Sequence, residues 1–518
     1  MDNIEALEQE FGLVADLVKI TARDLPDQTA FILDGRRQSY AQTIVLMDRV
    51  AAALQRDGVK QREAISVCAS TSIEYATLFL GALSIGVVTA PLAPSSTPEQ
   101  LEGMVKDCGA KLLFLDASTA DSLKNAGDAS TIRISLDDSD CGKPFSQWLA
   151  PAGSEPQPAK IDPQDPFNII YSSGTTGVPK GIVQSHRMRW SHVQRATLFQ
   201  YNRSAVTVLS TPLYSNTTLV SFFPTLAGGG TVALMKKFDA HKFLELASSL
   251  HATHAMLVPV QYHRIMSQPD FDSYDLSSFR IKFCTSAPFA GSLKSDILKR
   301  WPGGLIEYYG MTEGGGTCVL VAHEFPDKVD TVGRPSEGHD IRLIDENGVE
   351  VGPGEVGEVV GFSGTVMNGY HNQPGKTAEA QWVAPDGRVF IRTGDVGRFD
   401  EDGFLKLMDR RKDMIISGGF NVYPSDLESI LVKHPAVQEC AVVGVKSVEW
   451  GETPLAFVVL KTGASAAPED LREFANSKLG KTQRISKIEI VDALPRSAIG
   501  KILKRELRDE YEAKRANA

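Results

Sequence analysis

Hydroxyl groups, glycines and a lysine gather in one short stretch, residues 171–181, which reads Tyr-Ser-Ser-Gly-Thr-Thr-Gly-Val-Pro-Lys-Gly. Glycines let a backbone turn its N–H groups inward, and hydroxyls with an ammonium group then suit a polyphosphate. The stretch is not a Walker A loop, because Pro179 stands where that motif has its second glycine. A solvated turn is the alternative for this stretch taken alone.

A second chemically suggestive run is Tyr-Tyr-Gly-Met-Thr-Glu at residues 308–313. An aromatic ring beside a glycine offers a flat face to a nucleotide base. The Thr-Glu pair offers a hydroxyl for phosphate and a hard carboxylate oxygen for Mg²⁺. Further along, Asp395 in Arg-Thr-Gly-Asp can accept two hydrogen bonds from a ribose diol, although a Gly-Asp turn is the simpler explanation of that residue alone.

Basic residues mark two places in the last quarter of the chain. The charged run Asp-Arg-Arg-Lys-Asp at residues 409–413 is typical of an exposed link, and Ile-Ser-Gly-Gly-Phe-Asn follows at 416–421. Near the end, Lys501 follows a glycine in Pro-Arg-Ser-Ala-Ile-Gly-Lys. Such a lysine can meet charge that develops on a carboxylate oxygen and an α-phosphate. An exposed basic tail is the alternative, and it is our prediction for Lys504 and Arg505.

The elements that must position these residues alternate between helix and strand. Apolar spacing predicts helices at 40–56, 75–83, 99–108 and 241–251, and strands at 64–68, 87–90, 111–115, 205–210, 231–235 and 255–258. Continuous apolar strands between helices favour a largely parallel sheet. Residues 118–165 are rich in Asp, Ser, Ala and Pro, and we expect an irregular connector there.

The pattern changes near residue 340, where short strands are predicted at 340–344, 357–362, 388–391 and 403–407 between close turn signals. A compact β/α pattern follows, with helices at 425–433 and 468–479 and strands at 437–445, 455–460 and 487–491. We therefore predict an α/β protein with two domains. Residues 1–411 are predicted to form a large N-terminal domain of parallel α/β layers with a small β-barrel-like unit, and residues 412–518 a small α+β C-terminal domain that contains Lys501. The family resemblance given below implies that this small domain is mobile and that its lysine is catalytic.

Composition supports a multidomain protein of ordinary soluble character. The chain has 518 residues, of which 42% are hydrophobic and 23% charged. A net charge of −10 argues against general binding to nucleic acid or to membrane surfaces. The six cysteines are scattered, and no apolar run approaches the roughly 18 residues of a membrane span. The first residues, Met-Asp-Asn-Ile-Glu, are acidic and lack an apolar h-region, so we expect no signal peptide. We expect a cytoplasmic protein and leave its oligomeric state open, a homodimer included.

Taken in order, the motifs resemble those of the adenylate-forming superfamily, which comprises acyl- and aryl-CoA synthetases, 4-coumarate-CoA ligase-like enzymes, carrier-loading adenylation domains and beetle luciferases. The resemblance implies ATP-binding roles for Ser172, Ser173, Gly174, Thr175, Thr176, Gly177, Lys180, Ser286, Ala287, Pro288, Tyr308, Tyr309, Gly310, Met311, Thr312, Asp395, Arg410, Asn421 and Lys501. Within this set Tyr309 stacks on adenine. The resemblance also implies that Lys501, Thr175 and Glu313 are catalytic and that Glu313 and Thr175 hold Mg²⁺. Lys412 is implied as the hinge, and Gly418 and Gly419 as coenzyme A contacts.

The resemblance implies a two-step ligase. A carboxylate attacks the α-phosphate of ATP, which gives an acyl-adenylate and pyrophosphate, and coenzyme A then displaces AMP. The small domain serves the two steps in different poses. A ligase that loads a separate carrier protein and a non-catalytic nucleotide-binding protein are the alternatives in other classes.

The acid is predicted from the positions expected to line its pocket. Many family members carry a histidine after a motif like Thr-Pro-Leu-Tyr, whereas this chain has Ser215 there. The expected pocket positions are Tyr214, Ser215, Val258, Val260, Ala287, Gly310, Gly314, Gly315, Gly316 and Thr317. None of these is arginine or lysine, which disfavours malonate-like acids. The glycines favour a flat monocarboxylic acid, aromatic or cinnamate-like, with an aliphatic acid as the alternative.

Overall fold

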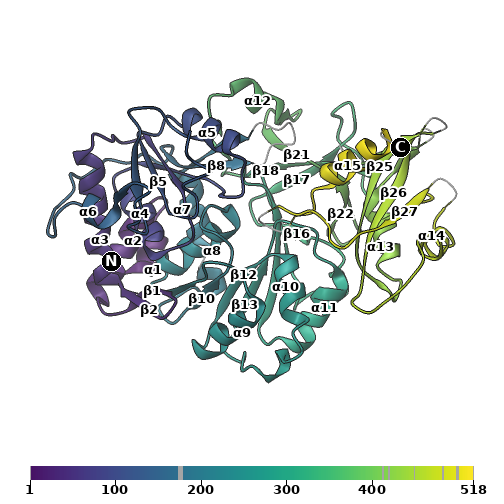
Figure 1. Ribbon diagram of the computed structural model, residues 1–518, viewed down its shortest axis with the longest axis horizontal. Helices are drawn as coiled ribbons and strands as arrows, with labels where there is room; N and C mark the ends of the chain where they lie inside the picture. The colour runs from purple at the N-terminus through teal and green to yellow at the C-terminus, as the bar shows by residue number, and fades with distance from the viewer. Residues whose placement is uncertain are drawn as a thin grey trace. The chain divides into compact units, whose positions relative to one another are not determined.

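The structure is a computed structural model that describes residues 2–172, 179–195, 197–410, 413–417, 420–447, 450–480, 483–497 and 501–516 (Figure 1). The chain divides into two compact units. The first comprises Met1–Asp330, Pro335–Asp340 and Phe362–Ile391, and the second comprises Thr331–Arg334, Ile341–Gly361 and Arg392–Ala518. The boundary that the sequence predicts after residue 411 stays a prediction, because residues 411 and 412 lie outside the described residues.

The first unit is built on two large sheets with mostly parallel cores. One sheet has the order β16 (Arg334–Pro335), β15 (Thr317–Val321), β14 (Gly304–Gly310), β13 (Ile281–Cys284), β12 (His254–Leu257), β10 (Val206–Leu209), β11 (Thr231–Leu234), β1 (Thr29–Leu33), β2 (Arg36–Ser39). The other has the order β19 (Gly369–Tyr370), β9 (Lys180–Ser185), β8 (Pro166–Ser172), β4 (Val88–Pro91), β3 (Ala64–Cys68), β5 (Leu112–Leu115), β6 (Ile132–Ser135), β7 (Lys143–Pro144). The central strands β10 to β14 and β3 to β6 pair in parallel, as the continuous apolar runs predict.

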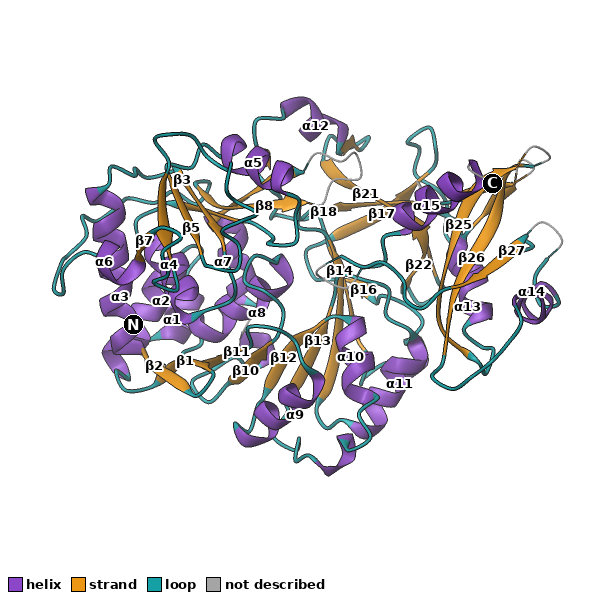
Figure 2. Cartoon of the chain, viewed as in Figure 1, coloured by secondary structure: helices purple, strands orange, loops and turns teal. Residues whose placement is uncertain are grey.

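Helices fill the space between these sheets and cover their outer faces (Figure 2). The helices of this unit are α1 (Asn3–Leu7), α2 (Val14–Asp24), α3 (Tyr40–Arg56), α4 (Ile73–Ser84), α5 (Pro98–Asp107), α6 (Phe145–Trp148), α7 (His186–Gln194), α8 (Asn216–Ala227), α9 (Ala240–Ser249), α10 (Pro259–Met266), α11 (Gly291–Arg300) and α12 (Pro374–Glu379). Helix α3 begins where its sequence indicates, because Ser39 and Gln42 cap it reciprocally.

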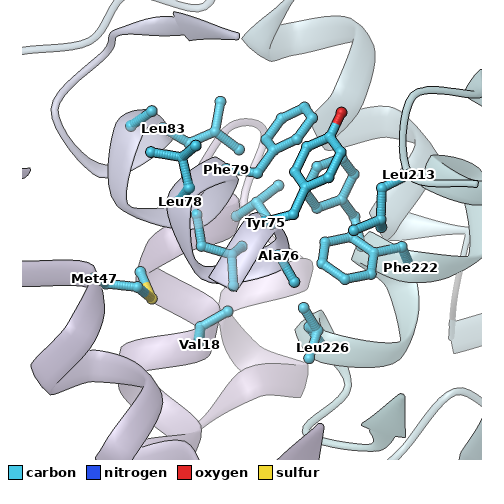
Figure 3. Packing of buried hydrophobic residues seen from close by; sticks show 14 of the residues in the cluster. Val18, Met47, Tyr75, Ala76, Leu78, Phe79, Leu83, Leu213, Phe222 and Leu226 are labelled. Carbon is cyan, nitrogen blue, oxygen red and sulfur yellow. The ribbon is translucent and has the colours of Figure 1, made fainter. Parts of the chain in front are cut away.

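The main hydrophobic core brings α2, α3 and α4 together with α8, which lies far from them in the sequence. Figure 3 shows Val18 of α2, Met47 of α3 and Phe79 of α4 packed with Phe222 and Leu226 of α8. Helix α4 is buried along almost its whole length, which explains its continuous apolar run in the sequence. These contacts fix α8, and therefore the residues just before it, against the sheets that carry the candidate site.

The second unit contains most of a five-stranded antiparallel sheet and a small α/β layer. The antiparallel sheet has the order β17 (Asp340–Ile344), β18 (Gly357–Phe362), β21 (Val389–Phe399), β20 (Gln381–Val383), and β22 (Leu405–Arg410) also pairs with β21. The other sheet has the order β24 (Phe420–Val422), β23 (Ile415–Ser417), β26 (Gly451–Leu460), β25 (Val437–Ser447), and β27 (Lys487–Ile490) pairs with β26. The helices of this unit are α13 (Pro424–Leu431), α14 (Pro468–Asn476) and α15 (Lys504–Ala516).

Two expectations from the sequence are wrong. Residues 118–165 are not wholly irregular, because β6, β7 and α6 lie there and β6 extends the parallel sheet beside β5. Lys504 does not belong to an exposed tail, because it begins α15 and its Nζ atom lies 2.8 Å from Glu428 Oε1. Among the residues that the structure describes, no helix combines the length and apolar character that a membrane crossing requires.

Candidate active site

Two antiparallel strands hold the ends of the predicted phosphate loop. β8 and β9 pair up to Ser172↔Lys180, so the loop connects the two strands of a hairpin. The Oγ atom of Ser172 is buried and has no hydrogen-bond partner among the described residues. The remaining loop residues of the prediction, Ser173, Gly174, Thr175, Thr176 and Gly177, lie outside the described residues.

Tyr370 links the loop strand to the Thr-Glu motif. Its hydroxyl donates to Glu313 Oε1 at 2.8 Å, and Lys180 Nζ lies 4.4 Å from the centroid of its ring. Tyr370 lies in β19, which pairs with β9, so the backbone fixes its position relative to Lys180. Burial, followed by the charge of Glu313, raises the pKa of Tyr370. The phenol therefore stays protonated and keeps donating to the carboxylate.

Glu313 is the described residue whose chemistry fits Mg²⁺ best. It is buried and sits beside the hairpin that frames the phosphate loop. Among the described residues no group of three or more histidine, cysteine or carboxylate side chains could form a metal cage. A single carboxylate suits Mg²⁺, which commonly binds through one or two carboxylates together with substrate phosphates. Thr175, the second predicted ligand, lies outside the described residues.

Two parallel strands bring the predicted adenine-binding segments to one edge of a sheet. β13 and β14 run side by side in register, with Cys284 opposite Glu307 (Figure 2). The segment 285–288 follows β13, and Tyr309 and Gly310 end β14. The carboxyl ends of parallel strands are where open α/β sheets bind ligands. The structure thus brings together these two predicted contacts, which lie about twenty residues apart in the chain.

Ser286 carries an unusual backbone conformation at this edge. Its φ is +83°, a left-handed value that is uncommon for residues other than glycine. Its Oγ atom lies 2.6 Å from Thr217 Oγ1 at the start of α8, and this hydrogen bond holds the turn. Strained residues of this kind concentrate at ligand sites. Of its predicted neighbours in the site, Ala287 is half-buried and Pro288 is exposed.

The ring of Tyr308 is occupied by packing. It stacks on Phe283 with 5.6 Å between ring centroids, and Phe283 stacks in turn on Tyr201 at 5.9 Å. Because adjacent strand residues point to opposite faces, Tyr309 lies on the other face of β14. The ring of Tyr308 therefore packs against the core, and the roles of Tyr308 and Tyr309 at the nucleotide stay predictions.

A glycine turn connects the motif to the next strand. β14 and β15 pair antiparallel, with Gly310 opposite Thr317, and Met311, Thr312, Glu313 and three glycines lie between them. The glycines have φ values of +78° (Gly314), +85° (Gly315) and +157° (Gly316). A Cβ atom on Gly314 would lie 2.6 Å from Thr365 O. The three glycines therefore allow a backbone conformation that other residues would adopt only with strain. Any space that they leave for an acid is a separate effect.

The other expected pocket positions lie where strands pass into helices. Tyr214 and Ser215 directly precede α8, and Ser215 is buried as its N-cap residue. Val258 is buried as the N-cap of α10, and Val260 is half-buried in its first turn. Burial raises the pKa of Tyr214 to about 12, so its phenol stays neutral.

A basic stripe on α7 was not anticipated among the pocket positions. It consists of Arg189, His192 and Arg195, which follow at intervals of three residues and so share one face of the helix and its end. Arg195 Nη2 lies 2.7 Å from Nε2 of His339, and Nδ1 of His339 accepts from the backbone N–H of Thr317 at 2.9 Å. The end of the stripe is thereby tied to the end of the glycine turn.

Arg189 ties the start of the stripe to the start of the same turn. Its guanidinium donates to Gln184 Oε1, to Asn168 Oδ1 at 3.1 Å and to Asn216 Oδ1 at 2.8 Å. Gln184 Nε2 in turn donates to the carbonyl of Thr312 at 2.7 Å. Burial lowers the pKa of Arg189 to about 9, which leaves it charged at neutral pH.

Asp395 lies inside strand β21, opposite Arg410 of β22, in the second unit. Its backbone N–H donates to Thr393 Oγ1 at 3.0 Å, and Thr393 donates to the carbonyl of Val359 at 2.8 Å. The alternative of a simple Gly-Asp turn is therefore wrong, although Gly394 bends the strand with φ of +71°.

Lys501, in the second unit, forms two hydrogen bonds with Ser497. Its carbonyl accepts from the N–H of Ser497 at 2.8 Å, and its N–H donates to Ser497 Oγ at 3.2 Å. Asn421 lies in β24 opposite Ile416, and Ser417 pairs with Phe420 at the end of that hairpin. Lys412, Gly418 and Gly419 lie outside the described residues.

Sequence reasoning missed Tyr370 and the basic stripe. The stripe had a readable signal, because Arg-x-x-His-x-x-Arg directly follows the phosphate-loop hairpin. Tyr370 had none, since nothing local indicates that a residue nearly two hundred positions after the loop pairs beside it.

Comparison with known proteins gives a consistent family match. A family model described as AMP-binding enzyme matches residues 18–371, and a model of the AMP-binding enzyme C-terminal domain matches residues 426–501. The chain is 32% identical over 523 residues to 4-coumarate–CoA ligase 2 of Oryza sativa subsp. japonica, covering 95% of this chain and 91% of the relative.

Two further relatives differ in the acceptor that their names state. Fatty acid–acyl-carrier-protein ligase ScoC of Streptomyces coeruleorubidus is 31% identical over 502 residues, covering 95% of both chains. The structure of the amide bond synthetase McbA from Marinactinospora thermotolerans superposes with a TM-score of 0.85 at 28% identity, covering 96% of this chain and 99% of that one. The shared fold therefore accommodates a thiol of coenzyme A, a carrier protein and an amide-forming acceptor.

Proposed function

Because the chain belongs to the family of AMP-binding enzymes, the adenylate-forming superfamily, we propose that it is an ATP-dependent carboxylic acid–coenzyme A ligase that forms AMP. In the first step a carboxylate oxygen attacks the α-phosphorus of ATP, and pyrophosphate leaves. In the second step the sulfur of coenzyme A attacks the acyl carbon, and AMP leaves. No enzyme nucleophile is required, because ATP activates the acid and the protein supplies position and charge.

The observation that carries this proposal is the Tyr370 link. One phenol holds the carboxylate of Glu313 and packs under the ammonium of Lys180, at the end of the phosphate-loop hairpin. An ammonium group and a carboxylate so placed suit a nucleotide triphosphate that arrives with Mg²⁺. When bound, Mg²⁺ would neutralise the phosphate charge, with Glu313 and Thr175 as its protein ligands.

The remaining roles follow the family pattern. Thr175, Thr176 and Lys180 would hold the β- and γ-phosphates, Tyr309 would stack on adenine, and Asp395 would bind the ribose. Lys501 would stabilise charge on the acyl carboxylate and α-phosphate in the first step. Lys412 would be the pivot about which the small domain turns, so that Gly418 and Gly419 serve coenzyme A in the second step.

For the acid we propose a flat aromatic or cinnamate-like compound. The glycine turn 314–316 carries no side chains, and Val258, another expected pocket position, is apolar and buried. The name of the rice relative supports an aromatic acid, whereas the name of ScoC supports an aliphatic one. An aliphatic acyl-CoA synthetase is therefore the second candidate, and a ligase for a separate carrier protein is the third.

A paired assay tests the proposal. Acid-dependent pyrophosphate release is measured across aromatic and aliphatic acids, and the acceptor is then varied between coenzyme A, a holo-carrier protein and a simple amine. We expect pyrophosphate release with aromatic acids and a thioester only with coenzyme A. Pyrophosphate release without a thioester would refute the acceptor but leave adenylation intact. A folded protein that releases no pyrophosphate with any acid would refute the ligase proposal itself.

A further inference from the structure

The basic stripe of Arg189, His192 and Arg195, together with His339, has no acidic counterpart in the described structure. None of these four residues forms an ion pair with a carboxylate in the part of the chain that the structure describes. The hydrogen-bond acceptors of Arg189 are neutral amide oxygens, and the partner of Arg195 is an imidazole nitrogen. Buried cations are ordinarily paired, so this arrangement calls for an anion from elsewhere.

Two polar atoms of the stripe lack any partner. Nη1 of Arg189 and Nδ1 of His192 are both buried and make no hydrogen bond within the described residues. Arg189 is only 1% exposed. Burial, and then the charges of Arg189 and Arg195, lower the pKa of His192, and burial lowers that of His339 to about 4. The two histidines are therefore neutral, and the positive charge of the cluster comes from Arg189, which packs over the rings of Phe167 and Phe223, and from Arg195. Nη1 of Arg189 and Nδ1 of His192 remain as hydrogen-bonding atoms that the described residues do not use.

The stripe lies along the turn expected to receive the acid. Its first residue reaches the carbonyl of Thr312 through Gln184, and its last reaches the N–H of Thr317 through His339. His192 stands between the two ends of the stripe. Between Thr312 and Thr317 the turn contains Glu313, whose carboxylate accepts from Tyr370, and then Gly314, Gly315 and Gly316, which have no side chains.

We propose that the stripe and His339 bind a second anionic group of the acid, at the end away from the carboxylate that ATP activates. The substrate would be a flat carboxylic acid that carries a second carboxylate or an equivalent oxyanion. This inference rests on the proposed function, and it replaces the expectation of a monocarboxylic acid. The pocket positions behind that expectation were Tyr214, Ser215, Val258, Val260, Ala287, Gly310, Gly314, Gly315, Gly316 and Thr317. Helix α7 contributes its two arginines from outside this set.

Matched acids test the inference. Pyrophosphate release is measured with cinnamate and 4-carboxycinnamate, and with hexanoate and adipate as a flexible pair. In the unaltered enzyme we expect kcat/KM to favour the acid with two carboxylates in at least one pair, by about tenfold or more. His192→Leu and Arg195→Met should each reduce that preference by roughly ten- to a hundredfold, the usual effect of losing a hydrogen bond to a charged group. Arg195→Lys should retain part of it.

Matched controls are available on α10. His263 and Arg264 are exposed there, and His263→Leu with Arg264→Met repeats the same substitutions away from the stripe. These controls should leave the ratio between acids unchanged, and thermal unfolding checks that every variant is folded. Arg189 is left intact, because it also holds Asn168, Gln184 and Asn216.

A binding measurement separates this inference from the ligase proposal. Calorimetric titration of 4-carboxycinnamate into unaltered protein and into His192→Leu requires no turnover. Weaker binding to the variant would support the second-anion site even if no acid yielded pyrophosphate. Equal binding to both proteins, or an unaltered enzyme that prefers the singly charged acid in both pairs, would overturn it.

Discussion

The hydrogen bond from the hydroxyl of Tyr370 to Glu313 can be removed by a single substitution, which tests the proposed role of Glu313. Tyr370→Phe keeps the ring that packs under Lys180 and removes the 2.8 Å hydrogen bond to Glu313. A hydrogen bond to a charged group contributes about 1.5–3 kcal/mol. We expect acid-dependent pyrophosphate release to fall by roughly ten- to a hundredfold, and the Mg²⁺ concentration for half-maximal rate to rise.

The Mg²⁺ dependence distinguishes this role from a structural one. Tyr262→Phe is the matched control, because its buried hydroxyl donates to the carbonyl of Phe283, away from Glu313. The control should alter thermal stability without moving the Mg²⁺ dependence. A Tyr370→Phe enzyme with unchanged Mg²⁺ dependence would mean that Glu313 does not serve the metal.

Lys180 is the only described basic residue of the predicted phosphate loop, and its role can be tested without disturbing the fold. Lys180→Met keeps most of the stem that lies over Tyr370 and removes the charge. We expect the KM for ATP to rise while the unfolding temperature stays within a few degrees. ATP kinetics equal to those of the unaltered enzyme would remove the loop from the mechanism.

For single residues, the sequence predicted the site residues that belong to contiguous motifs. It did not predict those that reach the site only because distant segments of the chain pack together. Glu313, Tyr309 and Lys180 could be named because each belongs to a contiguous pattern. Tyr370 could not, because its place beside Lys180 depends on the pairing of β19 with β9. The depth at which Arg189 is buried was equally invisible, since it depends on amide side chains from three other elements.

At the scale of the elements, substitutions in the turn between β14 and β15 can distinguish two roles of its glycines: leaving space for the acid and allowing a left-handed backbone. Gly315 has φ of +85°, so any side chain there costs about 1–3 kcal/mol whatever the space around it. Gly310 has no such φ, and a Cβ atom there would lie 3.3 Å from both Gly316 O and Thr317 Oγ1. The pair of glycines therefore provides a probe and its control.

Gly310→Ala should lower kcat/KM for cinnamate-like acids more than for acetate. Overpacking at a tight contact costs about 1–3 kcal/mol, and the penalty should fall on acids that fill the site. Gly315→Ala should instead lower the unfolding temperature and reduce the rate for acids of every size. Equal losses across acid sizes in Gly310→Ala would place the acid elsewhere.

The predicted elements were reliable where periodicity was strong. The helix over 40–56 is α3 and the strand over 64–68 is β3, because an amphipathic repeat and a fully buried run each indicate one structure. The prediction failed for residues 118–165, whose polar composition concealed β6. It failed again for Lys504, because α15 is strongly polar and is held by contacts such as the one to Glu428.

At the scale of the whole molecule, the proposal requires two units that act on one acyl carbon. The structure divides the chain into compact units, each with its own buried core. Glu313 and Lys180 belong to the first unit and Lys501 to the second. Adenylation and thioester formation need different groups around the same carbon. A rotation of the small domain about Lys412 would bring these groups to the acyl carbon one after the other.

Comparing the two half-reactions in two variants tests this alternation. Lys501→Ala removes a charge that we assign to the first step alone, and losing such a donor costs on the order of 10²–10³ in rate. It should suppress acid-dependent pyrophosphate formation by that factor while sparing thioester formation from a supplied acyl-adenylate. Lys412→Pro should have the opposite effect, because proline fixes φ near −65° and stiffens the pivot in the adenylating pose.

Arg505→Ala, in the exposed face of α15, is the control and should affect neither step. If each variant loses both half-reactions in the same proportion, the two steps share one arrangement of the units and the alternation is refuted, whereas the ligase activity itself would stand.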